Sequence, residues 1–424
     1  MKAIRLDSDG AYLGKCSLLE SPQRQLQDFA SLRLASEEDF LSYPVISEGF
    51  YDSHLHPSWM AKLKGHISCH KKSAEQIILE INNSTDPKVT GHGWDEESLG
   101  VSLKTFKGML DALSKNILLY RVCGHLAYQS TKGFITDKEI QKLPSEALDQ
   151  SKLDLSIKEL HDVGISSWAD LLLSPEDFTI LKNKEALLFG DVLHFEKFEK
   201  MKNGARPPYL KFFLDGSLGA HTAWLSQSYS DQESVGLQLW SDSNLSKMIL
   251  KCLNAGYLLA FHAIGDAALD QLLKISKKHK ENFERALRPN LFHRIEHLQV
   301  CRDDQIEELR KQGIWSLGIQ PSHRIADSDF SLQRLGPLRL HQQAYRLKSF
   351  MDAGLKVSLG SDAPIVSFDP LKNFDAILND SRKNESLSLS ETFKLYCVSG
   401  RQNAGIPAKK LLKNSTVWLS KIHL

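Results

Sequence analysis

Residues 345–362 read YRLKSFMDAGLKVSLGSD and contain the pattern that decides the fold. Apolar residues with helical spacing run up to Gly354, and a short apolar segment follows and ends at Asp362. Glycine just beyond a helix readily adopts the left-handed conformation of a C-terminal cap, and a continuous apolar run is typical of a strand buried on both faces. The segment therefore predicts a helix, its cap and a buried strand that ends in a polar residue.

The same pattern occurs three more times along the chain, and similar apolar runs bring the number of candidate strands to eight. The three repeats are SIKELHDVG with ISSWAD (156–170), LSKMILKCLNAG with YLLAFHAIGD (245–266), and QIEELRKQG with IWSLGIQPSH (305–323). The eight candidate strands lie in residues 49–56, 165–173, 186–195, 209–216, 258–266, 294–300, 314–321 and 356–362. Helices that alternate with buried strands predict βα units around a parallel sheet. Eight units favour a closed (β/α)8 TIM barrel, and an open doubly wound sheet is the alternative.

Residues 57–160 separate the first two candidate strands, which is too long for a single crossover. We expect an insertion here, with a helix at SAEQIILEINN (73–83), a turn at GHGWDEE (91–97) and a strand-like run at ILLYRVCGH (117–125). The two ends of the chain carry only short strand-like runs.

The composition is that of an ordinary globular protein. Its 53 basic and 52 acidic residues give a net charge of +1, which excludes the basic surface typical of nucleic-acid binding. No run approaches the roughly 20 apolar residues of a membrane span, and the first residues lack the apolar core of a signal peptide. The six cysteines form no CxxC pair or dense framework. We expect a cytoplasmic protein with no nucleic-acid or membrane partner, and one that could form a homodimer.

Metal-compatible side chains end several of the candidate strands. His54 and His56 alternate, which on a strand places both imidazoles on one face. His262, His297 and Asp362 each end a further strand, and barrel enzymes carry their chemistry at the carboxyl ends of their strands. Any one of these residues alone is more often a core histidine or a helix cap. Together they predict a shared metal site, because imidazole and carboxylate suit zinc and similar ions.

Lys211 lies among apolar residues of the candidate strand 209–216. A buried lysine is costly unless it is paired or neutral. An ion pair with Asp215 is one solution, and a structural lysine that extends its amine to solvent is another. A third is a neutral, nucleophilic amine that adds CO₂ and binds metal as a carbamate.

A competing motif, H-x-x-E-H, spans residues 293–297 and would bind zinc if it were helical. Its flanking residues favour a strand instead. Glu296 would then point away from His297 and act as a structural ion-pair partner, for example of Arg294. Asp52 is a candidate to orient a histidine through its second ring nitrogen, and stabilising a turn is the alternative role.

This combination resembles the amidohydrolase superfamily of metal-dependent hydrolases: HxH on the first strand, lysine on the fourth, histidine on the fifth and sixth, and aspartate on the eighth. The segments GFYDSHLH, GHGWDEE, RVCGH, KFFLDGSLG, HAIGD, RIEH, IQPSH, RLGP and GSDAPI lie between about Gly49 and Pro370. They resemble amidohydrolase family 3, the branch that includes YtcJ-like proteins and N-substituted formamide deformylase.

The resemblance implies a metal centre with one or two Zn²⁺ ions, other divalent metals being an alternative. The implied ligands are His54, His56, Lys211, His262, His297 and Asp362. The histidine pair would bind one ion with Asp362, and His262 and His297 the second, with a carboxylated Lys211 between the two ions. A single ion is the alternative if Lys211 is unmodified.

The resemblance also gives five candidates for substrate binding: His125, Trp94, Arg121, His221 and His323. A structural role is the alternative for each, such as a core anchor for Trp94 or a salt bridge for Arg121. His221 stands where relatives commonly have arginine. Family members usually form a small β-sandwich from both ends of the chain. Here we expect a small, reduced β-rich domain from residues 1–45 plus 406–424, and the barrel at 46–405.

The implied function is the hydrolysis of a C–N bond of an amide, N-formyl or cyclic amide substrate by a metal-activated hydroxide. Asp362 would be the catalytic residue that takes a proton and delivers it to the leaving amine. The substrate would be a small molecule. The alternatives are a mononuclear deaminase of an amino-heterocycle and a catalytically silent metal-binding barrel.

Overall fold

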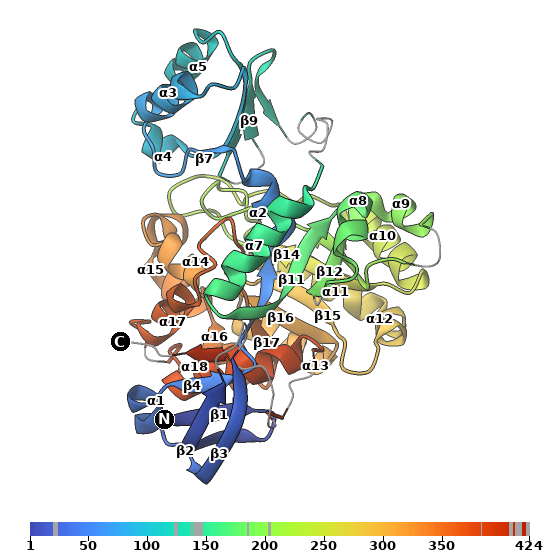
Figure 1. Ribbon diagram of the computed structural model, residues 1–424. Helices are drawn as coiled ribbons and strands as arrows, with labels where there is room; N and C mark the ends of the chain where they lie inside the picture. The colour runs from blue at the N-terminus through green and yellow to red at the C-terminus, as the bar shows by residue number, and fades with distance from the viewer. Residues whose placement is uncertain are drawn as a thin grey trace. The chain divides into compact units, whose positions relative to one another are not determined.

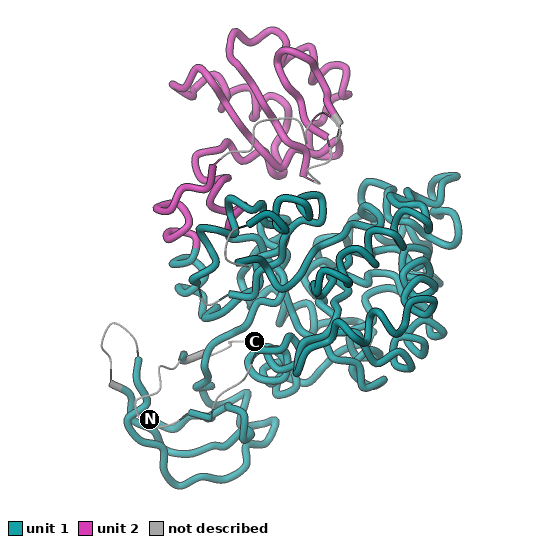
Figure 2. Tube along the Cα trace, turned by 90° about the vertical axis from the view of Figure 1, so that its right-hand side faces the viewer, with its two compact units in different colours: residues 1–57, 157–424 teal, residues 58–156 magenta. Residues whose placement is uncertain are grey.

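The computed structural model describes residues 1–19, 24–122, 126–136, 139, 147–184, 186–201, 205–382, 384–406, 410–411 and 418–420. The chain forms two compact units (Figure 2). The larger unit contains residues 1–57 and 157–424, and the smaller one contains residues 58–156.

An eight-stranded parallel sheet forms the centre of the larger unit (Figure 1). The strands in sheet order are β17 (Lys356–Leu359), β16 (Trp315–Ile319), β15 (His293–His297), β14 (Leu258–Ala263), β13 (Tyr209–Phe213), β12 (Ala186–Asp191), β11 (Ile165–Leu173) and β5 (Phe50–Leu55). Sheet order follows chain order, as in a (β/α)8 barrel. The first and last strands meet just beyond their ends, where the Asp362 N–H donates to His54 O at 2.6 Å and the His56 N–H to Ala363 O at 2.9 Å. The predicted barrel is confirmed.

The four predicted glycine caps are also confirmed. Helices α7 (Gln150–Asp162), α10 (Asp242–Asn254), α13 (Asp303–Gln312) and α16 (Leu347–Asp352) each end one or two residues before one of them. The cap glycines adopt positive φ angles: Gly164 88°, Gly256 83°, Gly313 65° and Gly354 74°. A side chain is strained in this region, whereas glycine is not. A barrel strand begins one or two residues after each of these glycines. Every residue of β14, β15 and β16 is buried.

Further helices surround these strands. They are α8 (Pro175–Leu181), α9 (Phe195–Glu199), α11 (Asp266–Lys278), α12 (Lys280–Ala286), α14 (Ser322–Ala326), α15 (Ser331–Gln343), α17 (Pro370–Leu378), α18 (Leu389–Lys394) and α19 (Gly400–Asn403), with a 3₁₀ turn at Val192–His194 and a π-helical turn at Leu395–Ser399. Helix α15 breaks at Gly336, where φ is 71° and ψ is 165°.

Strands from both ends of the chain pair in a second sheet of the larger unit. Its order is β18 (Trp418–Ser420), β4 (Val45–Ser47), β1 (Lys2–Asp7), β2 (Gly10–Leu19) and β3 (Gln25–Leu34). Helix α1 (Glu37–Ser42) connects β3 to β4 and begins with a capping box at Ser36. A small apolar core lies on this sheet and consists of Ala3, Cys16, Leu26, Ile46 and Leu411.

The smaller unit has its own five-stranded sheet and its own core. The sheet order is β10 (Gly133–Thr136), β9 (Leu126–Gln129), β8 (Asn116–Arg121), β7 (Lys88–Trp94) and β6 (Ile67–Ser68). Its helices include α3 (Ala74–Asn83), α4 (Glu96–Leu99) and α5 (Leu103–Asp111), and α2 (Pro57–Leu63) begins at the boundary with the larger unit. The predicted helix at 73–83 is confirmed as α3. The turn predicted at 91–97 is wrong in its first half, because the fully buried Trp94 extends β7 into the core.

Among the described residues, no helix has the length and apolar character needed to cross a membrane.

Candidate metal centre

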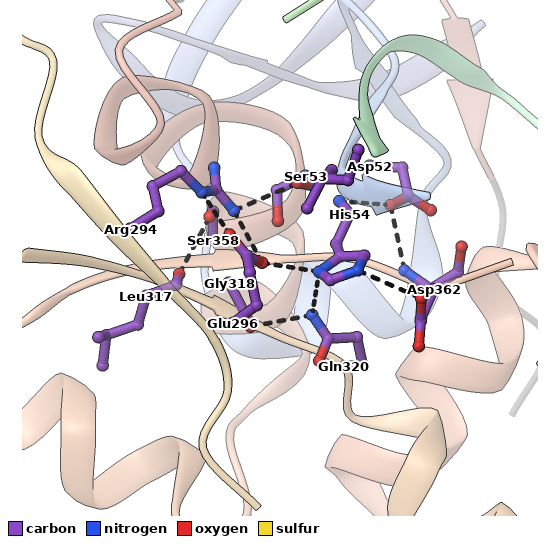
Figure 3. Close-up of polar contacts among 12 residues, drawn as sticks. Asp52, Ser53, His54, Arg294, Glu296, Leu317, Gly318, Gln320, Ser358 and Asp362 are labelled. Carbon is purple, nitrogen blue, oxygen red and sulfur yellow. Dashed lines mark hydrogen bonds and ion pairs between the residues drawn. The ribbon is translucent and has the colours of Figure 1, made fainter. Parts of the chain in front are cut away.

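His54, His56 and Asp362 lie together at the carboxyl ends of the first and last barrel strands. Figure 3 shows His54 and Asp362 side by side. Asp362 Oδ1 lies 3.2 Å from His54 Nε2 and 3.1 Å from His56 Nε2. All three side chains are buried, and their ligand atoms lie within 4.8 Å of one another. This spacing is suitable for a shared metal ion.

Outer hydrogen bonds determine which ring nitrogens face Asp362. His54 Nδ1 lies 2.7 Å from Glu296 Oε2, and His56 Nδ1 lies 2.6 Å from the backbone oxygen of Leu171. A carboxylate and a carbonyl oxygen only accept hydrogen bonds, so both Nδ1 atoms donate and neutral rings present bare Nε2 atoms. In neutral rings, three acceptor atoms would then converge with no hydrogen to share. A divalent cation fits this donor set, because imidazole nitrogen and carboxylate oxygen are zinc ligands.

A second group of potential ligands consists of His297, His323 and Asp362. His323 Nε2 lies 3.4 Å from Asp362 Oδ2. His297 Nδ1 is buried and has no hydrogen-bond partner among the described residues. The His297 ring centroid lies 4.9 Å from that of His54 and 4.3 Å from that of His262. The structure therefore brings the four predicted histidine ligands into one cluster, and adds His323 to it.

His262 presents one ring nitrogen to the backbone. Its Nε2 lies 3.0 Å from the carbonyl oxygen of Gly216, which can only accept a hydrogen. The neutral ring then carries its lone pair on Nδ1. This is the same arrangement as in His54 and His56 with the two nitrogens exchanged.

Lys211 is 2% exposed, and its Nζ has no hydrogen-bond partner among the described residues. Burial lowers the pKa of Lys211 to about 8, although the carboxylates of Glu296 and Asp362 act in the opposite direction. An amine with this pKa is partly neutral near pH 8 and can react with CO₂.

The ion pair between Lys211 and Asp215, one of the three alternatives from the sequence, does not form. Asp215 instead accepts three backbone hydrogen bonds, from the N–H groups of Trp224 (2.9 Å), Ile264 (3.1 Å) and Gly265 (2.7 Å). Through these bonds, the Asp215 carboxylate holds the start of α11 beside the end of β13. Lys211 is also too deeply buried to reach solvent, which excludes the structural lysine with an exposed amine.

Asp362 and His297 share an unusual backbone conformation. Their φ angles are 64° and 77°, in the left-handed region that residues other than glycine seldom adopt. Strain of this kind is often found at functional sites. Burial alone would raise the pKa of Asp362, but the surrounding His54, His323 and His56 side chains lower it well below the usual range. The carboxylate is therefore ionised at neutral pH.

The structure corrects the role expected for Glu296. Glu296 does bind Arg294, with Oε1 2.7 Å from Nε, as predicted. It also contacts His54, so it does not point away from the site. Strict alternation would place residues 296 and 297 on opposite faces of the strand. The positive φ of His297 turns its side chain back, so both residues reach His54.

The proposed orienting role of Asp52 is wrong. Asp52 Oδ1 accepts hydrogen bonds from the backbone N–H groups of His54 and Ser361, both at 3.1 Å. Among the described residues, its carboxylate has no hydrogen bond to a histidine ring. Burial raises the pKa of Asp52 to about 7. Its position between the first and last strands explains these bonds, because both backbone segments meet there.

The motif at 293–297 forms strand β15, as expected from its flanking residues, and not a zinc-binding helix. His293 is fully buried. Its Nδ1 accepts a hydrogen bond from the Leu259 N–H at 3.1 Å, and its Nε2 donates to Phe283 O at 3.0 Å. His293 is therefore a structural histidine.

The remaining candidates for substrate binding occupy different places. In the larger unit, His221 lies in the loop after β13 with Nε2 3.1 Å from Asp231 Oδ1. In the smaller unit, Trp94 is fully buried and donates to Leu119 O at 3.1 Å, as a core anchor does. Arg121, also in that unit, pairs with Glu96 at 2.9 Å. His125 lies outside the described residues.

The barrel has clustered histidines and an ionised aspartate at the carboxyl ends of its strands, and a buried lysine within β13. These are characteristics of a metal-dependent hydrolase. Comparison with protein families agrees with this class: residues 48–405 match the model of the Amidohydrolase family. The match covers most of the sequence, so the chain belongs to the Amidohydrolase family.

Three individual relatives share between 21% and 26% sequence identity with the chain. The chain is 26% identical to YtcJ of Bacillus subtilis, over 85% of this chain and 80% of that protein. It is 22% identical to the N-substituted formamide deformylase of Arthrobacter pascens, over 60% of this chain and 44% of the relative. The crystal structure of an uncharacterized metal-dependent hydrolase from Pyrococcus furiosus matches with a TM-score of 0.74 and 21% identity, over 99% of this chain and 98% of the other. This structural likeness supports the fold.

Proposed function

We propose that this amidohydrolase cleaves a C–N bond of a small amide, N-formyl or cyclic amide substrate. The observation that carries the proposal is the convergence of His54 Nε2, His56 Nε2 and Asp362 Oδ1. The buried amine of Lys211, which has no hydrogen-bond partner among the described residues, supports it. The name of one relative, N-substituted formamide deformylase, supports this bond type.

We further propose Zn²⁺ as the metal, in one or two sites. His54, His56 and Asp362 would hold one ion, and His262 and His297 a second, with Lys211 between them as a carbamate. When bound, the metal supplies a Lewis acid and lowers the pKa of water. The carbamate forms when the neutral Lys211 Nζ attacks the carbon of CO₂, which creates an N–C bond and releases one proton to solvent.

Side chains of the protein would then transfer the protons of the reaction. Asp362 is the group that accepts a proton from the attacking water and delivers it to the leaving nitrogen. Its Oδ2 faces His323 Nε2 at 3.4 Å, which orients the carboxylate. His221 and His323 are the candidates in the larger unit for contacting the substrate.

The experiment that tests this function is a screen of zinc-loaded protein against N-substituted formamides, simple amides, cyclic amides and amino-heterocycles. We expect a carboxylic acid together with an amine or ammonia from the formamides and simple amides, and a single ring-opened product that carries both groups from cyclic amides. Release of ammonia from an amino-heterocycle alone would indicate the deaminase alternative. No turnover of any class by metal-loaded protein would favour the silent barrel.

We also propose a small-molecule substrate, no nucleic-acid partner and a cytoplasmic location. The five described cysteines, Cys16, Cys69, Cys252, Cys301 and Cys397, are free and buried, which supports a reducing compartment. Sedimentation of the purified protein tests whether it forms a homodimer.

A further inference from the structure

The carboxylate of Glu296 lies between a ring nitrogen of His54 and the guanidinium of Arg294 (Figure 3). Its Oε2 is 2.7 Å from His54 Nδ1, and its Oε1 is 2.7 Å from Arg294 Nε. Both residues of this charged pair are completely buried. A buried pair is not by itself a source of stability, because desolvation offsets the attraction. Its contact with His54 suggests a different use.

Neighbouring backbone holds the pair in one position. Arg294 Nη2 donates to the backbone oxygen of Ser53 at 3.2 Å, one residue before His54. On the other side lies Gly318 of β16. A Cβ atom there would come within 1.9 Å of Glu296 Oε2 and 2.5 Å of Arg294 Nη2. Strand β16 therefore packs directly against the pair at Gly318, and the Glu296 carboxylate has little room to turn away from His54.

Two groups compete for the Nδ1 atom of His54. Glu296 is an acceptor at 2.7 Å, whereas the side-chain amide of Gln320 places its Nε2 at 3.2 Å. The same amide nitrogen donates to Gly318 O at 2.9 Å, so it is the N–H end of Gln320 that faces His54. An acceptor favours the ring with hydrogen on Nδ1, and a donor favours the ring with hydrogen on Nε2. The charged acceptor is closer and gives the stronger bond.

We propose that Glu296 is a positioning residue that selects the Nδ1–H form of His54 and so keeps His54 Nε2 free to bind metal. Arg294 holds the carboxylate in place, and Gln320 would favour the opposite form if Glu296 were absent. This inference rests on the proposed metal centre, because His54 Nε2 faces Asp362 at 3.2 Å.

Nitrogen NMR of the histidine rings in metal-free protein tests the hydrogen position directly, with the His54 signals assigned from a His54→Asn variant. We expect hydrogen on Nδ1 in the wild type and on Nε2 in Glu296→Gln, since the amide can donate to Nδ1. In Glu296→Gln/Gln320→Met the Nδ1–H form should partly return. The same ring form in the wild type and in Glu296→Gln would overturn the proposal.

Zinc affinity, measured by competition with a chelator, provides a second readout. We expect roughly 10- to 100-fold weaker binding in Glu296→Gln, the range seen when outer partners of metal ligands are removed. Arg294→Met/Glu296→Leu removes both charges, so it should fold without an unpaired buried charge and show the same loss. Asp39→Asn removes the charge of Asp39 in α1 from its ion pair with Arg33 of β3. This variant is the control and should keep wild-type affinity.

The outcomes separate the two proposals. Wild-type zinc affinity in both Glu296→Gln and the double variant would show that the Arg294–Glu296 pair has only a structural role. If the wild-type protein itself bound no zinc, the proposed metal centre would fail, and the NMR result would still decide whether Glu296 sets the ring form of His54.

Discussion

Asp362 Oδ1 lies 3.1 Å from His56 Nε2, although 306 positions separate the two residues in the chain. The contact joins the last barrel strand to the first, beside the backbone hydrogen bond from Asp362 N–H to His54 O. Any ion bound by the side chains of His54, His56 and Asp362 would therefore also hold the barrel closed. Binding at the proposed metal site would then be thermodynamically linked to folding, and this linkage can be measured.

Removal of metal should lower thermal stability. An ion that binds only the folded state at 100 times its dissociation constant adds about 2.7 kcal/mol to the free energy of unfolding. Calorimetry of zinc-loaded protein with and without a chelator should show a lower Tm after chelation. In a His54→Ala/His56→Ala variant the chelator should have a smaller effect. An identical wild-type Tm under both conditions would contradict the linkage.

Replacement of Lys211 tests the carbamate. Lys211→Ala should lower the metal content per chain and reduce kcat by about 100-fold or more, because the oxygens between the two proposed sites are lost. Added formate or acetate should restore part of the rate by filling the space with a small carboxylate. Lys211→Met, which leaves less space, is the control and should not respond. Full metal content and rate in Lys211→Ala would exclude the role.

Asp362→Asn should separate proton transfer from substrate binding. Loss of general acid–base catalysis typically lowers rates by 10²–10⁴-fold. We expect a decrease of about this size in kcat with a smaller change in KM, measured with any substrate found in the screen. Because Asp362 is also a proposed ligand, the metal content of the variant must be measured alongside. Wild-type kcat in the fully loaded variant would contradict its catalytic role.

His293 should make the fold sensitive to acid. Burial lowers the pKa of His293 to about 4, against about 6.5 in an unfolded chain. Because the folded-state pKa is depressed, the neutral ring stabilises the fold above pH 6.5, and this contribution is lost as the pH falls from 6.5 towards 4. Between pH 7 and pH 5 the loss is about 2 kcal/mol.

Urea unfolding at pH 7 and pH 5 measures this contribution. His293→Gln should be less stable than the wild type at pH 7 and should lose less stability on acidification. The same pH dependence in both proteins would show that other groups cause the acid sensitivity.

Local sequence patterns predicted the barrel because each unit carries its own signals. The glycine after each helix and the apolar run behind it depend on neighbours in the chain, and so does the placement of His54, His56 and Asp362 at strand ends. The contact between Glu296 and His54 could not be predicted in this way. It depends on the spacing across separate strands and on the absence of a side chain at Gly318.

Two further features of the site could not be predicted from the sequence, for related reasons. Alternation along β15 placed Glu296 and His297 on opposite faces, and only the left-handed backbone at His297 brings both to one site. His323 was a candidate for the substrate, yet it also lies beside Asp362, because α14 starts directly at the end of β16. Strand periodicity does not describe residues beyond a strand's last hydrogen bond.

The most direct test of the central claim is the zinc content per chain, measured by elemental mass spectrometry on wild-type protein and on His54→Ala/His56→Ala after reconstitution. We expect about two ions per wild-type chain, or one if Lys211 is unmodified, and a clear loss in the variant. No bound metal in reconstituted wild-type protein would contradict the claim that these residues form a metal centre.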